Sequence, residues 1–166
     1  SDLSDNNGAR IEALEMHKRA NRMVHRINSH FGAESIFAVH IASAPSMSIP
    51  GVSNSSDSLL KSMHEILSWD WMEAKIVIEH CDSCTNKNTV EKGFMSINNE
   101  IESLLTLSSD YKVGLTLNWA RSAIEGRSPL TVIEHIKLAS ENNLLSGIIF
   151  SGVSINDEMY GEWKDL

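Results

Sequence analysis

The feature that most constrains the fold is an alternation along the chain between stretches with helical spacing and short apolar runs. Short runs that are almost wholly apolar are typical of parallel strands, because such sheets are buried on both faces. A helical stretch between two strands supplies the crossover that parallel pairing requires. The order therefore predicts an α/β fold with right-handed crossovers, rather than a helix bundle or a β-sandwich. The predicted strands are residues 36–42, 75–79, 113–117 and 147–150.

Local signals mark the ends of the predicted helices. Serine and aspartate side chains can accept hydrogen bonds from the free N–H groups of a first turn, and glycine suits a helix end. Proline is harmless at the first helical position, where its missing N–H would have no partner. The start signals are Ser56 or Asp57, Ser96, and Ser128 with Pro129, and the end signal is Gly32. The residues expected on the buried sides of the third and fourth helices are Ile97, Ile101, Leu104, Leu105, Val132, Ile133, Ile136 and Ala139.

Length and charge limit the classes of function. A chain of 166 residues predicts a single domain, residues 1–166, with a real hydrophobic core. The net charge of −8 argues against a nucleic-acid or anionic-membrane surface, so a small molecule is the expected partner. No apolar run reaches the roughly 18 residues that a membrane span requires. Two cysteines are too few for a disulfide framework, which favours a cytoplasmic location.

Polar residues follow all four predicted strands. In parallel α/β proteins the reactive groups gather at the carboxyl ends of the strands, which lie at one edge of the sheet. Residues 40–43, 79–82, 118–121 and 151–154 are therefore the expected site region.

Glu79 is the strongest single candidate in this region, because a carboxylate that ends a buried Val/Ile strand is unusual unless it is functional or held in a salt bridge. His40 is either a ligand or acid–base group, or a core histidine with its hydrogen bonds satisfied. His80 alternates with Glu79 along an extended strand, so we expect it on the opposite face, packed against a helix.

Trp119, Arg121, Arg127 and Ser151 are the candidates for substrate binding. Trp119 could stack on a sugar ring or pack under a loop. The two arginines flank residues 122–126, a predicted loop before the fourth helix, where free N–H groups favour an anion. Their guanidinium groups could hold a carboxylate or phosphate, or pair with Glu125 or another local acid.

Cys81 and Cys84 form a CxxC pair whose context does not favour redox chemistry. A redox pair normally opens a helix that lowers the thiol pKa, whereas Cys84 precedes a loop-like stretch with no helix start before about Ser96. A structural zinc site would need two further ligands, and no second CxxC or HxxxH motif supplies them.

Several segments carry a resemblance to a known group of proteins: IFAVHIASAP, KIVIEHCD, GLTLNWARSAIEGRSPL, GIIFSGVS and YGEWKDL. Together they resemble an uncharacterised bacterial family whose members look like xylose-isomerase-type TIM barrels. The resemblance implies a TIM-barrel-like fold and, with four strands of the usual eight, the C-terminal half of a longer barrel. It also implies that Glu79 holds a divalent metal (Mn²⁺, Mg²⁺ or Zn²⁺) and that His40 lies at the site.

The chain departs from that superfamily at two strand ends. Asn118 stands where an aspartate is common, with no histidine shortly after it, and Ser151 follows a strand that often brings a histidine. Two functions are therefore expected. One is isomerisation or epimerisation of a small polyhydroxylated metabolite, a sugar or sugar acid, by metal-assisted proton transfer, with Glu79, His40 and Asn118 as catalytic groups. The other is metabolite binding without catalysis on a barrel that has lost its metal.

A half barrel would leave two unpaired strand edges and an apolar inner face. We therefore expect the chain to associate, either as a homodimer or with a separate N-terminal half.

Overall fold

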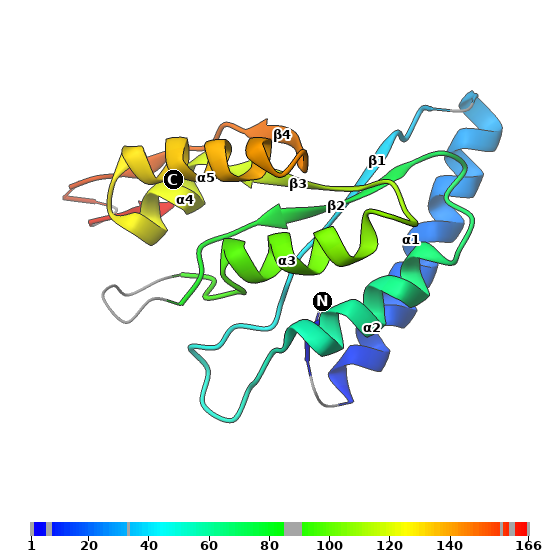
Figure 1. The fold of residues 1–166 in the computed structure, drawn as a ribbon, viewed down its shortest axis with the longest axis horizontal. Helices are drawn as coiled ribbons and strands as arrows, with labels where there is room; N and C mark the ends of the chain where they lie inside the picture. The colour runs from blue at the N-terminus through cyan, green and yellow to red at the C-terminus, as the bar shows by residue number, and fades with distance from the viewer. Residues whose placement is uncertain are drawn as a thin grey trace.

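A parallel sheet of four strands forms the centre of the structure (Figure 1). The computed structural model describes residues 2–5, 8–32, 34–84, 91–156, 158–159 and 162–165. The strands are neighbours in chain order, and each adjacent pair is parallel. The predicted α/β class and the parallel sheet are therefore confirmed. The strands are β1 (Ala38–Ile41), β2 (Lys75–His80), β3 (Val113–Asn118) and β4 (Leu145–Ile149).

A helical segment precedes every strand of this sheet. The helices are α1 (Ala9–Phe31), α2 (Ser56–Leu67), α3 (Ile97–Leu107), α4 (Trp119–Gly126) and α5 (Pro129–Glu141). A short antiparallel pair, β5 (Val153–Ser154) and β6 (Lys164–Asp165), follows β4. Among the described residues, no helix is both long and apolar enough to cross a membrane.

The core lies between one face of the sheet and the helices (Figure 1). Ile41, Ile78 and Leu117 from three neighbouring strands point into it, and each is at most 3% exposed. Because every crossover joins adjacent strands in the same order, crossovers of one hand place all the helices on one side. The opposite face, called the inner face below, carries the alternate side chains of the strands, such as His40, Glu79 and Asn118.

The helix ends follow local chemistry closely. Ser96 and Ser128 cap α3 and α5 by accepting hydrogen bonds from backbone N–H groups, and Gly32 ends α1, all as predicted. The cap of α2 is Ser55, one residue before the predicted Ser56, because the Ser55 side chain accepts from the N–H of Ser58 at 3.1 Å.

The prediction of a loop over residues 122–126 is wrong, because α4 begins directly at the end of β3. The Asn118 side chain accepts a hydrogen bond from the Arg121 N–H at 3.3 Å and so starts the helix. Arg127 ends it in the left-handed conformation. Asparagine is a favoured cap, so this turn contains the signal for a helix.

The buried stripes of α3 and α5 include polar residues and exclude two predicted apolar ones. Leu105 is 44% exposed and Ile133 is 52% exposed, whereas Glu100 and His135 are buried. The helices are therefore rotated so that a carboxylate and an imidazole enter the protein interior.

We expect Leu117→Ala to lower the free energy of unfolding by about 2–5 kcal/mol, because it removes buried methyl groups and leaves a cavity at the centre of the sheet. The matched control is Leu130→Ala, at a side chain that is 67% exposed, which should change stability by less than about 0.5 kcal/mol. Chemical denaturation of both variants measures the difference. Equal losses would contradict the position of β3 in the core.

Candidate functional site

Glu79, His40 and Asn118 meet on the inner face at the carboxyl end of the sheet. The Asn118 side-chain amide donates to Glu79 Oε1 at 3.1 Å, and His40 Nδ1 lies 3.8 Å from Glu79 Oε2. The Glu79 and His40 side chains are 28% and 41% exposed, so a solute can reach both. The structure thus brings together three side chains from three neighbouring strands, while their catalytic role stays a prediction.

Ser151 fixes the orientation of the Asn118 amide. Its hydroxyl donates to Asn118 Oδ1 at 2.6 Å, and the same oxygen accepts from the Arg121 N–H. With its oxygen satisfied by two donors, the amide must present its NH₂ group to Glu79. Ser151 therefore positions Asn118, and its predicted contact with a substrate is untested.

Trp119 lies at the same end of β3 and stacks on Phe150, with ring centroids 5.6 Å apart. Phe150 is 77% exposed. The pair forms an aromatic surface beside the carboxyl ends of β3 and β4.

A hollow of about 540 Å³ extends over the inner face from His40 toward the other end of the strands. Val77, Thr116 and Ile149 contribute to its floor, and Lys75 lies at its far end. The hollow is mainly apolar with a few polar groups, which is the usual composition of a small-molecule site.

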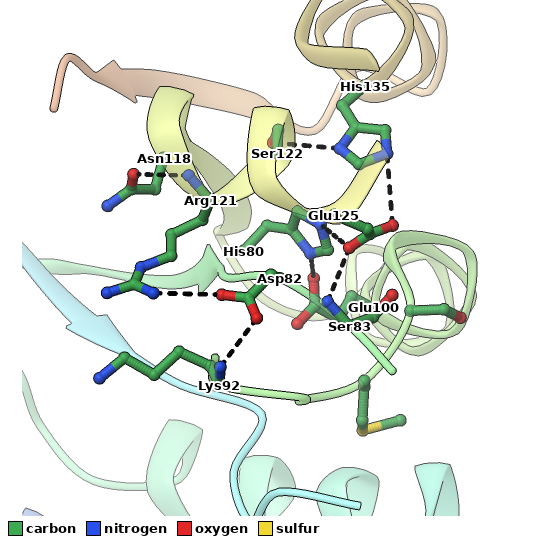
Figure 2. A network of polar contacts seen from close by, with 12 residues as sticks. His80, Asp82, Ser83, Lys92, Glu100, Asn118, Arg121, Ser122, Glu125 and His135 are labelled. Carbon is green, nitrogen blue, oxygen red and sulfur yellow. Dashed lines mark hydrogen bonds and ion pairs between the residues drawn. The ribbon is translucent and has the colours of Figure 1, made fainter. Parts of the chain in front are cut away.

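A second polar group lies on the opposite, helix-facing side of the sheet (Figure 2). His80 is fully buried there, as strand alternation predicted, and its Nδ1 contacts Glu100 Oε2 of α3 at 2.6 Å. The other oxygen of Glu100 accepts from the Ser43 hydroxyl. A histidine of β2, a glutamate of α3 and a serine that follows β1 thus form one buried chain of hydrogen bonds.

Glu125 and His135 complete this second group. Glu125 Oε2 lies 3.4 Å from His80 Nε2 and accepts from the Ser83 N–H at 2.7 Å. Glu125 Oε1 lies 3.7 Å from His135 Nε2, and the Nδ1 of His135 contacts the Ser122 hydroxyl at 3.1 Å. We call His80, Glu100, Glu125 and His135 the buried cluster.

The buried cluster shifts the pKa values of its members in opposite directions. Burial alone would lower the pKa of His80, but Glu100 and Glu125 raise it to about 10. Burial and the neighbouring His80 lower the pKa of His135 to about 4. Burial would raise the pKa of Glu125, but His80, the Ser83 N–H and His135 lower it. One charged and one neutral imidazole therefore share the space between two carboxylates.

Arg121 is engaged within the protein. Its Nη1 contacts Asp82 Oδ1 at 3.3 Å and Glu91 Oε2 at 2.7 Å, and the residue is only 7% exposed. The Oδ2 atom of Asp82 accepts from the N–H group of Glu91. It also accepts from the N–H group of Lys92 (Figure 2). Arg121 was predicted either to bind a substrate anion or to pair with a local acid. The contacts support the second alternative, with Asp82 and Glu91 as the acids.

Arg127 does not join Arg121. Its side chain donates to the Glu162 carbonyl at 3.3 Å, and its backbone ends α4. The turn between α4 and α5 therefore does not unite two guanidinium groups in the way that an anion site would require, and substrate binding by either arginine stays untested.

The cysteines have the chemistry of protonated thiols. Burial, together with the nearby Glu79 and Glu100, raises the pKa of Cys81 to about 12, and burial also raises the pKa of Cys84. Both thiols are free. Thiolates carry out redox chemistry, so these values agree with the unfavourable redox prediction. The loop-like stretch predicted over residues 85–88 lies outside the described residues.

Within the described part of the chain, one group of three His, Cys, Asp or Glu side chains has ligand atoms within 4.8 Å of one another: His80, Glu125 and His135. Among the described residues, Glu79 contacts the imidazole of His40 and the amide of Asn118. These residues do not form a complete ligand set for a divalent ion, so metal binding by Glu79 stays a prediction.

Sequence reasoning missed Glu100 and His135, and it named Glu125 only as a possible partner of the two arginines. Glu100 and His135 each stand on the apolar stripe of a predicted helix, next to Ile101 and Ile136. A charged or ionisable residue on such a stripe is the available signal, since burial without a partner is costly. Glu125 gave no such signal, because the sequence predicts a loop over its segment, residues 122–126.

A family model described as "Domain of unknown function (DUF4862)" matches residues 3–166. The chain is also 33% identical over 157 residues to the uncharacterized protein STM3670 of Salmonella typhimurium (strain LT2). The matched region covers 95% of this chain and 48% of that protein. The chain thus spans about half the length of this curated relative. No solved structure matches the chain.

We expect Arg121→Met to destabilise the fold by about 3–5 kcal/mol, because it leaves the carboxylate of Asp82 buried without its charged partner. Lys112→Met, at the exposed pair that Lys112 forms with Glu73, is the control and should have little measurable effect. Urea denaturation compares the two. A stable Arg121→Met protein would argue against this structural role and restore a role in substrate binding.

Proposed function

The chain belongs to the DUF4862 family, and on that premise we propose that it contributes the acid–base site of a sugar isomerase or epimerase. The substrate is a small polyhydroxylated metabolite, and the reaction moves a proton on the carbon beside a carbonyl group. The observation that carries the proposal is the Glu79 carboxylate, which contacts both Asn118 and His40 on a partly exposed inner face.

The topology supports a barrel origin for this site. The four strands are consecutive neighbours, and their helices lie on one face, an arrangement that half of a singly wound (β/α)8 barrel would have. A doubly wound fold would instead have helices on both faces. The Glu79 group lies at the carboxyl ends of the strands, where barrel enzymes place their catalytic residues.

The contacts of Glu79 suit a general base. Asn118 holds one carboxylate oxygen in place, and the other oxygen faces His40 across 3.8 Å. This separation is too long for a direct hydrogen bond, so both groups can contact a substrate hydroxyl. A carboxylate can take the proton from the carbon beside the carbonyl while an imidazole protonates the carbonyl oxygen, which gives an enediol. Return of a proton to the other carbon of the enediol, with loss of the proton from its hydroxyl group, completes the isomerisation. No step of this proposal depends on a metal ion at Glu79.

The surroundings favour a neutral polyhydroxylated substrate over an anionic one. Arg121 is occupied by Asp82 and Glu91, and Arg127 is turned toward Glu162. The aromatic pair Trp119–Phe150 offers a flat apolar surface of the kind on which sugar rings stack.

Metabolite binding without catalysis is the second candidate. It is favoured by the incomplete set of metal ligands around Glu79 and by the neutral Asn118 at a position where the resembled superfamily commonly has an aspartate. In this case the hollow binds a sugar and no proton moves.

Deuterium exchange separates the two functions. The whole protein is incubated in D₂O with a panel of aldoses, ketoses and aldonic acids, and mass spectrometry follows deuterium at the carbon beside the carbonyl. We expect incorporation into at least one sugar, and a loss of about 10²–10⁴-fold in Glu79→Gln, because the amide cannot accept the proton. Glu73→Gln, at an exposed glutamate, is the control and should retain full exchange.

Sugar binding without exchange would support the binding protein and reject the isomerase. Equal exchange in Glu79→Gln and the unmodified protein, both folded by circular dichroism, would remove Glu79 from the mechanism.

The sheet also supports the proposed association. Within the described residues, β1 and β4 each pair with a strand on one side only. Phe37 and Phe150, next to these edge strands, are 75% and 77% exposed. Further strands, from a second copy or from a longer polypeptide, would cover the inner face and both edges.

We expect the isolated 166-residue chain to form a dimer, because burying its apolar inner face gains about 25 cal/mol per Å². Size-exclusion chromatography with light scattering measures the mass. A well-folded monomer of 18.4 kDa at all concentrations would show that the open sheet is self-sufficient.

A further inference from the structure

We propose that His80, Glu125 and His135 form a binding site for a divalent transition-metal ion of the Zn²⁺ class. The site lies behind the sheet, among β2, α4 and α5 (Figure 2). It is separate from Glu79, which projects from the other face of the same strand. Its role is to join these three elements, so it goes beyond the proposed proton transfer.

The ligand atoms lie close together, since one atom from each of the three residues is within 4.8 Å of the others. Bonds of about 2.0–2.2 Å to tetrahedral Zn²⁺ place neighbouring ligand atoms roughly 3.3–3.6 Å apart. Glu125 lies 3.4 Å from His80 Nε2 through one oxygen and 3.7 Å from His135 Nε2 through the other. Two imidazoles and one carboxylate are also a common ligand set for Zn²⁺.

The outer nitrogen of each imidazole is already held. His80 Nδ1 contacts the Glu100 carboxylate, and His135 Nδ1 contacts the Ser122 hydroxyl. These contacts fix both rings with Nε2 toward Glu125. Histidines that bind metals usually have such a partner on the other nitrogen, often a carboxylate, because it orients the ring and makes it more basic.

The Nε2 atom of His80 is the independent sign of a missing ligand. His80 is 0% exposed, and within the described residues its Nε2 has no hydrogen-bond partner. The 3.4 Å contact with Glu125 is within ion-pair range but lacks hydrogen-bond geometry. A buried nitrogen in this state is costly, whereas a coordination bond to a metal satisfies it.

The charges nearby also favour a divalent cation. Asp82 and Glu91 have Arg121 and Lys164 as partners. Glu100 and Glu125 place two buried carboxylates next to the two imidazoles of His80 and His135. A divalent ion bound to two neutral imidazoles balances both carboxylates.

One of the three ligands, His135, lies next to a hollow at the surface. A shallow hollow of about 390 Å³ lies between the start of α3 and α5, and His135 contributes to its wall. Glu134, Lys137 and Glu141 also line this hollow, and Lys137 pairs with Glu141 at 3.8 Å.

Metal titration of the intact chain tests the proposal. After treatment with a chelator, the chain is titrated with Zn²⁺ alone, and with Co²⁺ alone to record the visible spectrum of the bound ion. We expect one equivalent to bind, a tetrahedral-type Co²⁺ spectrum, and a higher melting temperature with Zn²⁺. His135→Gln and Glu125→Gln should lose binding, and Glu100→Gln should weaken it by about 10–100-fold, as loss of an outer partner does.

Two controls retain the metal if the proposal is correct. His17→Gln removes a buried histidine of α1 that is not part of the cluster, and Glu79→Gln removes the inner-face carboxylate. Loss of the metal in Glu79→Gln with retention in His135→Gln would place the ion at the inner face and overturn the proposal. If the cluster variants do not fold, the unmodified chain still decides: a folded protein that binds neither ion at micromolar concentrations excludes the site.

Discussion

The contact between His80 and Glu100 is the interaction on which the arrangement of the other elements depends. Both side chains are fully buried, so each would be strongly destabilising without the other. Glu100 can meet His80 only if α3 packs with this turn against β2, and its second oxygen then reaches Ser43 after β1. One buried pair thus aligns the carboxyl ends of two strands with the helix that follows them.

The alternation of β2 divides the polar residues at its end between two environments. Glu79 points to the open inner face, while His80, one residue later, points into the helix layer. The open side has few contacts and can accept a solute, whereas the closed side is a dense network that also includes Ser83 and Glu125. The network makes the strand end rigid, and a rigid strand end is a suitable base for a catalytic carboxylate.

Apolar runs and helix-capping residues made most of the fold predictable, and they also placed the Glu79 group at the carboxyl end of the sheet. The strands follow from their apolar runs, and Ser96 and Ser128 cap helices through contacts made within three residues. The alternation of side chains along a strand was sufficient to predict that Glu79 and His80 point to opposite faces of the sheet. The partners of Glu125 and Arg121 were not predictable, because His80, Asp82 and Glu91 are distant in the chain from both residues. Both residues also lie in a helix that only the capping role of Asn118 reveals.

Asn118 makes three contacts through one small amide: it caps α4, accepts from Ser151 and donates to Glu79. Exchanging its NH₂ group for an oxygen atom would preserve the first two contacts and reverse the third. An aspartate there would face Glu79 as a second carboxylate, and the pair would require a proton or a cation between them. A single atom at the end of β3 therefore determines whether this edge of the sheet carries one carboxylate held by an amide or two carboxylates side by side.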